Sequence, residues 1–333
     1  MKKYDLHTHF YPAEFFTTIE RADSDFSFQQ VGDMRFIAYQ GTRFFGIRPP
    51  MSDMGLRLEA MDRAGVDVAV ISMGPLIQFV KDPAAQAKAC RELNDRYAVH
   101  VSEHPDRLLA YGTVPMGDQD EAVAELERIL DDLRFQGVIL PSNIKGDYYD
   151  DPRFTPFFEA ADARGLCLFL HPQVPPGSGN LRDHMLGSTV GFMYDTTTSV
   201  LRALYGGLFD RYPNIRWHIA HAGGALPWLM ERIDNGWRDY PENRERLPEL
   251  PSTYLKRLYY DTVSFTPHTM RLLRDVVGTD HMVMGTDFPH PLGDIDRGVS
   301  TIMSLDIPEH ERVNILQNTA LSILNNVPSP GIG

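Results

Sequence analysis

The sequence predicts an α/β fold in which eight parallel strands alternate with helices and close into a (β/α)8 barrel. Eight short apolar runs, rich in β-branched residues, end in Gly, Pro, Ser or polar residues, as buried parallel strands do. Amphipathic helical patterns separate these runs. This repeated alternation indicates a barrel whose active site lies at the carboxyl ends of the strands. A doubly wound open sheet is the structural alternative.

Length and composition agree with one large domain. A chain of 333 residues could hold one domain or two, and α/β barrels reach this size as one. With 43% hydrophobic and 23% charged residues, the composition is that of an ordinary globular protein. We therefore expect residues 1–333 to form a single barrel domain.

The predicted elements are spread along the whole chain. The strands cover residues 4–10, 66–72, 108–114, 136–142, 166–172, 215–224, 258–264 and 282–289. Helical patterns cover residues 84–102, 119–134, 153–164, 198–211, 225–238, 267–277 and 308–325. In the second of these, Leu126, Ile129, Leu130 and Leu133 recur at helical spacing, and acidic residues occupy the other face.

Two long segments interrupt this alternation. Residues 11–57 are rich in Phe, Gly and polar residues, and residues 172–197 have the composition of a loop. Long loops that follow barrel strands lie at the barrel mouth, where they commonly determine specificity. We therefore expect residues 11–57 to be an insertion over the barrel mouth.

Charge and cysteine content exclude several kinds of partner. Asp and Glu outnumber Lys and Arg by 45 to 32, and the formal charge of −13 argues against nucleic acid binding. The sequence shows no signal-peptide pattern and no run of about 18 apolar residues, so we expect a cytoplasmic protein that does not bind membranes. Cys90 and Cys167 lack zinc-site or redox spacing and are expected to be reduced packing residues.

Two histidines at the end of the first predicted strand indicate a metal site. His7 and His9 are two residues apart, and the two-residue period of a strand points both side chains to one side. Such a pair is a weak signal by itself in a chain with 12 histidines. The pair supports a metal site because it lies at the carboxyl end of a predicted strand, where barrel active sites are found.

Three more residues end other predicted strands on the same rim. His171 ends the fifth strand, His221 the sixth and Asp287 the eighth. Each alone could be a buried, hydrogen-bonded histidine or a helix-capping aspartate, but all five at strand ends favour one site. Imidazoles with one carboxylate suit Zn²⁺, or a related ion such as Mn²⁺, better than Mg²⁺ or Ca²⁺, which prefer oxygen ligands.

Four motifs carry a family resemblance: DLHTHF, FLHP, IAHAGG and MGTDFPHPLG, in this order and at these strand positions. With them the chain resembles the amidohydrolase superfamily (amidohydrolase-related family 2), which implies an amidohydrolase-type TIM barrel. Within it, RLEAMDRAGVDVAVIS, PNIRWHIAHAGG and ERIDNGWR are similar to the 2-amino-3-carboxymuconate-6-semialdehyde decarboxylase group, which includes γ-resorcylate decarboxylase-like enzymes. The resemblance extends over almost the whole chain.

The resemblance also implies roles for individual residues. It implies one divalent metal ion bound by His7, His9, His171 and Asp287. It further implies that His221 acts as a catalytic acid and base, and that Arg48, in GIRPP, contacts a substrate carboxylate. Asp287 counts as catalytic too, because a carboxylate that binds metal through one oxygen can accept a proton on the other. A homodimer is the assembly that the resemblance suggests.

The chain departs from the family pattern at two places. Binuclear members carry a carboxylated lysine at the end of the fourth strand, whereas here that strand ends VILPSN and Lys145 lies beyond it, so we expect one metal. Decarboxylases of this group commonly have an aromatic residue where this chain has His290, which we place on the substrate-binding surface. His218 has the opposite strand parity to His221 and is expected to face the helical layer.

These features predict a metal-dependent nonoxidative decarboxylase that acts on a small unsaturated or aromatic carboxylate without an organic cofactor. A divalent ion can polarise substrate oxygens, and a histidine can move protons near neutral pH. The first alternative is a metal-dependent hydrolase that cleaves an ester, lactone or amide with the same residues. The second is a noncatalytic barrel with a structural ion, although structural zinc sites usually have closed, Cys-rich ligand shells.

Overall fold

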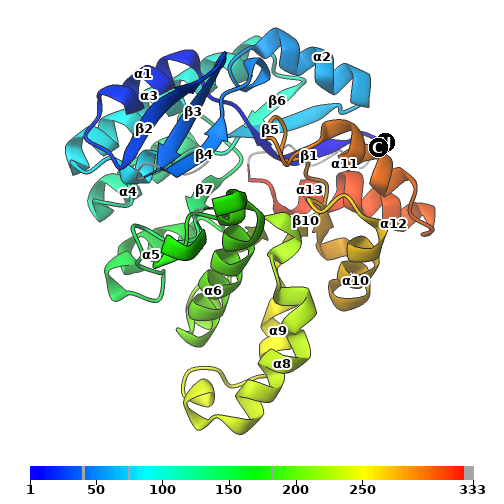
Figure 1. The fold of residues 1–333 in the computed structure, drawn as a ribbon. Helices are drawn as coiled ribbons and strands as arrows, with labels where there is room; N and C mark the ends of the chain where they lie inside the picture. Colours follow the sequence, from blue (N-terminus) through cyan, green and yellow to red (C-terminus); the bar gives the residue numbers. More distant parts are fainter. Residues whose placement is uncertain (40–41, 74–75, 182, 326–333) are drawn as a thin grey trace.

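The computed structural model describes residues 1–39, 42–73, 76–181 and 183–325. Eight parallel strands form its centre (Figure 1), and each lies within a predicted strand range. They are β1 (Tyr4–His9), β5 (Val68–Ser72), β6 (Leu108–Ala110), β7 (Val138–Pro141), β8 (Cys167–His171), β9 (Arg216–Ile219), β10 (Tyr259–Asp261) and β11 (Met282–Val283).

The strands form two parallel sheets whose edges meet. One sheet has the order β1-β5-β6 and the other β11-β10-β9-β8-β7. At one seam, Gly112 beyond β6 accepts a hydrogen bond from Ile139 N at 2.9 Å and donates one to Gly137 O at 2.9 Å. At the other seam, Leu6 N donates to Met284 O at 3.0 Å. The fold is therefore a closed (β/α)8 TIM barrel, and the open-sheet alternative is wrong.

A helix follows each strand and covers the outside of the barrel (Figure 1). These helices are α2 (Met54–Ala64), α3 (Pro83–Glu103), α4 (Gln119–Asp131), α5 (Thr155–Ala163), α6 (Phe192–Tyr205), α8 (Leu226–Asp239), α10 (Pro267–Val277) and α11 (Ile295–Met303). Shorter helices are α7 (Leu208–Arg211), α9 (Pro251–Leu255), α12 (Glu309–Val313) and α13 (Thr319–Ile323). Several begin at an aspartate whose carboxylate accepts a backbone N–H, as Asp53 and Asp118 do.

The last helix closes the amino-terminal end of the barrel. Ala320, Ile323 and Leu324 belong to the same buried cluster as the strand residues Leu6 and Cys167. Asn325 is hydrogen-bonded to the beginnings of two strands. Its side-chain oxygen accepts a hydrogen bond from Cys167 N at 2.7 Å, and its backbone N–H donates one to Gln136 O at 3.0 Å. The predicted helix 308–325 is thus divided into α12, a π-helical turn and α13.

The insertion after β1 has more regular structure than the sequence suggested. It contains α1 (Ala13–Arg21) and an antiparallel sheet of β2 (Phe26–Val31), β3 (Met34–Tyr39) and β4 (Thr42–Gly46). Gly32, with φ of 59°, turns the chain between β2 and β3. In Figure 1 this sheet lies beside α1, to one side of the barrel strands.

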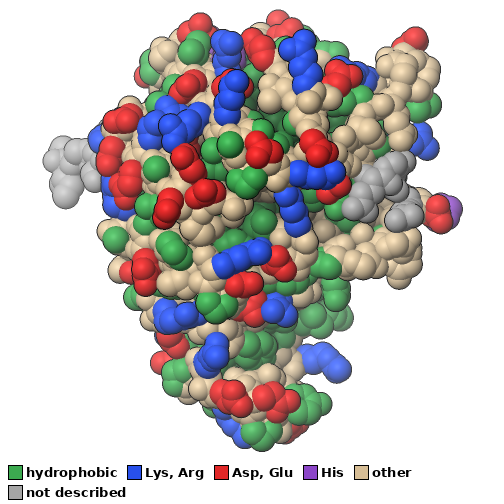
Figure 2. All heavy atoms as spheres, turned by 90° about the vertical axis from the view of Figure 1, so that its left-hand side faces the viewer, with side chains coloured by type: hydrophobic (Ala, Val, Ile, Leu, Met, Phe, Trp, Pro, Cys, Tyr) green, Lys and Arg blue, Asp and Glu red, His purple; other side chains and the backbone are tan. Residues whose placement is uncertain are grey.

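The face of the molecule in Figure 2 carries acidic, basic and apolar side chains that are interspersed with one another. This mixture fits the formal charge of −13. Among the described residues, none of the helices has the length and apolarity that a membrane span requires.

Candidate metal centre

Four side chains converge at the carboxyl end of the barrel. The ligand-capable atoms of His7, His9, His171 and Asp287 lie within 4.8 Å of one another, and all four residues are buried. The Nε2 atoms of His7 and His9 are 3.1 Å apart. Asp287 Oδ1 is 3.4 Å from the first and 3.1 Å from the second. The structure therefore brings together the four residues that the sequence indicated.

The hydrogen bonds of these histidines leave lone pairs directed at one another. His7 Nδ1 lies 2.5 Å from Asp261 Oδ2, so a neutral His7 carries its proton on Nδ1 and presents the lone pair of Nε2. His171 Nδ1 lies 3.1 Å from Pro172 O, and its Nε2 is buried without a hydrogen-bond partner among the described residues. An unpartnered buried nitrogen is costly unless a cation takes its lone pair. The donor set thus fits one divalent transition ion.

The buried surroundings shift the pKa values of the residues in the cluster. Burial alone would raise the pKa of Asp287, but hydrogen bonds from His221, His7 and His9 hold that pKa well below its usual value. Burial, followed by the neighbouring His9 and His7, lowers the pKa of His171 well below its usual value. Metal ligands must be an ionised carboxylate and neutral imidazoles, and the shifts at Asp287 and His171 favour these forms. Burial alone would lower the pKa of His7, but Asp261 and Asp287 raise it to about 10, so metal binding must displace a proton from His7.

The backbone around the site is tightly constrained. Asp287 and His221 both have a φ of 54°, in the left-handed region that non-glycine residues seldom adopt. Asp287 N donates to His7 O at 2.7 Å, which ties the end of β11 to β1. Such strained residues persist only where their surroundings fix them, and they cluster at functional sites.

Asp261, at the end of β10, is a site residue that the sequence reasoning missed. Besides His7, its carboxylate accepts hydrogen bonds from His221 N at 3.0 Å and from Ala222 N at 2.9 Å. Burial alone would raise the pKa of Asp261, but the adjacent His7 outweighs burial and lowers it. This ionised carboxylate orients one metal-site histidine and the turn that carries His221. Its signal in the sequence is an acidic residue at the end of the strand in YYDTV.

His221 lies beside the cluster. Its ring centroid is 4.9 Å from that of His7, and its Nε2 is 3.5 Å from Asp287 Oδ2. The prediction that His218 faces the helical layer is wrong. Its ring stacks on that of Phe169 in the barrel interior, with the ring centroids 4.3 Å apart. The physical reason is that His221 follows the strand in a left-handed turn, so strand parity does not relate the two residues.

A cavity of about 500 Å³ lies over the cluster. His171, His221 and Asp287 contribute to its wall, together with His290. Much of the remaining wall is apolar and consists of Phe45, Leu76, Met185, Phe192, Met193, Val263, Phe265 and Leu292. A small, largely apolar ligand therefore fits above the cluster.

His290 belongs to this cavity, whereas Arg48 lies behind it. Tyr11 Oη is 2.8 Å from His290 Nε2, and both residues line the cavity. Arg48 is exposed and lines a separate hollow of about 190 Å³, which His290 shares. Its backbone before Pro49 is extended, with φ of −116° and ψ of 148°. Lys145 is also exposed, and its Nζ donates to Val80 O at 3.3 Å, outside the cluster.

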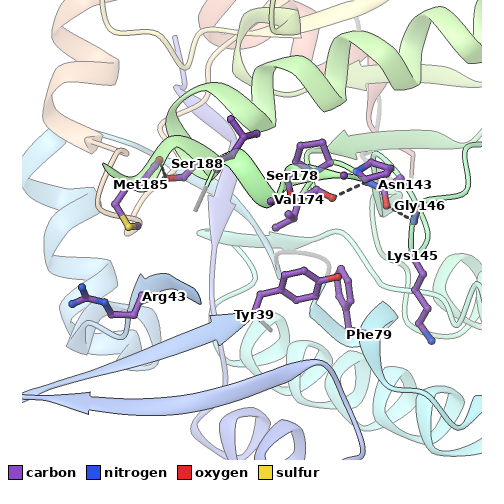
Figure 3. A pocket seen from close by; sticks show the side chains of 16 residues that line it. Tyr39, Arg43, Phe79, Asn143, Lys145, Gly146, Val174, Ser178, Met185 and Ser188 are labelled. Atoms are coloured by element: carbon purple, nitrogen blue, oxygen red, sulfur yellow. Dashed lines mark hydrogen bonds between the residues drawn. The ribbon is translucent and has the colours of Figure 1, made fainter. Parts of the chain in front are cut away.

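A second cavity of about 450 Å³ shares lining residues with the first, and Figure 3 shows the side chains that line this second cavity. It lies between β3, the segment that follows β7 and the segment that follows β8, and is lined by residues that include Tyr39, Phe79 and Asn143. Met185 and Ser188 are the described residues that line both cavities.

Comparisons with known proteins agree with the fold. γ-Resorcylate decarboxylase from a Rhizobium species is 30% identical over 79% of this chain and 84% of its own. The 2-amino-3-carboxymuconate-6-semialdehyde decarboxylase of Dictyostelium discoideum is 29% identical over 83% of this chain and 78% of its own. The crystal structure of 5-carboxyvanillate decarboxylase from Sphingomonas paucimobilis superposes with a TM-score of 0.85 at 25% identity, over 97% of this chain and 98% of its own.

The family model described as amidohydrolase matches residues 4–325, which include every strand of the barrel and all four residues of the cluster. The chain therefore belongs to the amidohydrolase family.

Proposed function

We propose that this protein is a metal-dependent nonoxidative decarboxylase that acts on a small aromatic or unsaturated carboxylate. The observation that carries the proposal is the position of the three-histidine, one-aspartate cluster in the wall of a mainly apolar cavity of about 500 Å³. The carboxylate of a ring compound would face the cluster while the ring contacts the apolar wall. The relatives, which are named for decarboxylation, support this choice of reaction.

We propose that His7, His9, His171 and Asp287 hold one Zn²⁺ or Mn²⁺ ion, with Zn²⁺ favoured by the three imidazoles. Such an ion, when bound, supplies positive charge that draws electrons from the substrate carboxylate and a neighbouring oxygen. Asp261 holds His7 in the tautomer that this arrangement requires.

The protein's own residues must deliver a proton to carbon. In decarboxylation the bond from the ring carbon to the carboxylate breaks, its electron pair stays on the ring carbon, and a proton forms the new C–H bond as CO₂ leaves. We assign the proton to His221, which lines the cavity beside Asp287. Asp287 Oδ2, at 3.5 Å from His221 Nε2, is the acceptor that can exchange protons with it.

We propose that His290 and Arg48 contact the substrate. His290 lines the cavity directly, and Tyr11 holds its ring through Nε2. Arg48 reaches the cavity only past His290, because the two residues share the smaller hollow. Its guanidinium is placed to attract a carboxylate toward the mouth and can bind it through two parallel hydrogen bonds.

The test of the reaction is a substrate screen with CO₂ detection on metal-loaded protein. The panel holds hydroxybenzoates and muconate-type acids beside aryl esters, lactones and amides. We expect CO₂ release from at least one carboxylate, with loss of the activity when Asp287 is changed to Ala. Cleavage of esters, lactones or amides without CO₂ release would replace the decarboxylase with a hydrolase that uses the same residues.

We further propose a cytoplasmic homodimer. Trp228, Tyr194 and Leu292 are 79%, 61% and 55% exposed, and they follow the carboxyl ends of β9, β8 and β11, at the same end of the barrel. A second copy would remove this apolar surface from water. Light scattering should report a dimer that Trp228→Glu weakens, whereas Val99→Glu, an exposed site on α3, should not. The unpaired, buried Cys90 and Cys167 agree with a reducing compartment.

A further inference from the structure

We propose that Met185 determines the size of the carboxylate that the site accepts, by separating the cavity over the cluster from the second cavity. This inference rests on the proposed function and deepens it. Met185 and Ser188 line both cavities, which measure about 500 Å³ and 450 Å³. In Figure 3 these two residues lie at one end of the second cavity, and Asn143 and Lys145 lie at the other end. The second cavity therefore extends away from the metal cluster.

Hydrogen bonds hold the backbone of this partition in place. The carbonyl oxygen of Met185 accepts hydrogen bonds from Ser188 Oγ and from Thr189 Oγ1, both at 3.1 Å. His184 and Met185 are consecutive left-handed residues, with φ of 56° and 57°, and a π-helical turn (Gly187–Gly191) follows them. A conformation this uncommon is kept because its surroundings determine it. The wall between the cavities is thus a side chain on a fixed backbone.

The Met185 side chain is the part of the wall that substitution can remove. It is 43% exposed and lines both cavities. Truncation of its unbranched thioether to Ala would leave the two hydrogen bonds to its carbonyl unchanged. The two cavities would then join into one longer cavity.

The second cavity has an aromatic surface that a ligand substituent extending past Met185 would contact. The rings of Tyr39 and Phe79 line it, with centroids 5.0 Å apart in an edge-to-face arrangement. Figure 3 shows both rings between Met185 and Lys145. Arg43, Asn143 and Lys145 line the cavity as well. The chemical class that this space fits is an aryl carboxylate with an aromatic substituent. In the wild-type protein Met185 limits the ligand to a single substituted ring.

The experiment compares a short and a long ligand on protein loaded with Mn²⁺. The short ligand is 2,6-dihydroxybenzoate, and the long ligands are the positional isomers of benzyl-substituted 2-hydroxybenzoate. Dissociation constants are measured by calorimetry and CO₂ release in parallel. Met185→Ala is compared with Met185→Leu, which conserves volume, and with Leu181→Ala, which removes apolar atoms from the second cavity alone.

We expect Met185→Ala to improve binding of at least one long isomer, relative to the short ligand, by about tenfold or more, and both controls to stay within about threefold of wild type. An unchanged ratio in Met185→Ala, or an equal gain in Leu181→Ala, overturns the role of Met185. If the short ligand binds but no ligand releases CO₂, the proposed reaction fails while the binding ratio still decides the role of Met185. If no aryl carboxylate binds the metal-loaded protein, both proposals fail.

Discussion

At the scale of single residues, the hydrogen-bond partner of each histidine determines which ring nitrogen carries the proton and which one faces the cluster. His7 presents Nε2 to the cluster because Asp261 occupies its Nδ1, and His171 does so because its Nδ1 faces Pro172 O. Asp261 has a second task, since it also accepts the backbone N–H groups of His221 and Ala222. One carboxylate outside the ligand set therefore couples metal binding to the placement of the acid–base residue.

Asp261→Asn should weaken metal binding by about 10- to 100-fold, because an amide cannot supply the charge that supports His7 as a ligand. Metal affinity is measured by competition with a chelator. Asp234→Asn is the matched control: Asp234 is also buried, but its carboxylate accepts Ser252 N at 2.9 Å, away from the cluster. Equal metal affinity in the two variants would remove Asp261 from the site.

His221→Ala should lower kcat by about 100-fold or more, with the metal retained, because His221 is placed in proton transfer and not among the ligands. Steady-state kinetics give kcat and elemental analysis gives the metal content, both measured on the same preparation. His310→Ala, at an exposed position on α12, should leave both unchanged. Loss of metal in His221→Ala would reassign this residue as a ligand.

Arg48→Ala and Arg48→Lys should each reduce kcat/KM for a carboxylate substrate by at least about tenfold, or about 1.4 kcal/mol, because Lys cannot reproduce a two-pronged hydrogen bond. Arg63→Ala is the control, since Arg63 lines the same hollow but pairs with Asp296 at 3.1 Å. Full activity of Arg48→Ala would make it an ordinary surface arginine.

The sequence was informative about which residues meet and less informative about how they are oriented. His7, His9, His171 and Asp287 could be grouped because parallel strands end on one rim. The inward position of His218 could not be obtained by counting, because a left-handed turn separates it from His221. Likewise, the extended backbone of Arg48 followed from Pro49, but its position behind His290 depends on tertiary packing.

At the scale of secondary structure, the strands were predictable because burial on both faces requires continuous apolar sequence. The sheet β2-β3-β4 was missed although residues 26–39 contain a hairpin signal, two alternating runs around Gly32-Asp33. Helix α11 was also missed, although Asp294 caps it and Ile295, Val299 and Ile302 form its buried face.

Close packing between neighbouring strands provides a test at this scale. A Cβ on Gly137, just before β7, would lie 2.1 Å from the carbonyl oxygen of Cys167 in β8. Gly137→Ala should therefore lower the free energy of unfolding by at least about 2 kcal/mol, because the strands must separate locally. Gly179→Ala, where a Cβ meets nothing within 4 Å, is the control in the same urea titration. Equal stability of the two variants would contradict the described β7–β8 contact.

For the whole molecule, the cluster joins the two halves of the chain. His7 and His9 lie at the start of the sequence and Asp287 near its end, so an ion bound between them ties β1 to the segment after β11. A ligand that binds only the folded state stabilises it by about 2.7 kcal/mol at a free concentration of 100 Kd. Metal binding should therefore stabilise the folded state in addition to its role in the reaction.

Removal of the metal with a chelator should lower Tm, and added Zn²⁺ or Mn²⁺ should restore it in proportion to the logarithm of metal concentration. Differential scanning calorimetry measures both changes. In His7→Ala the same metal additions should leave Tm unchanged, because a ligand is missing. A metal-dependent Tm in that variant would place the stabilising ion elsewhere.

Helix α13 and Asn325 close the amino-terminal end of the barrel, and this affects how substrate enters and how products leave. In the described part of the chain, packed side chains fill this end of the barrel and the cavity over the cluster lies at the carboxyl end, so substrate and products use the carboxyl end. The aromatic product then occupies the same cavity as the substrate. Departure of the aromatic product must then precede the next arrival, so that product should compete with substrate for the same free form of the enzyme.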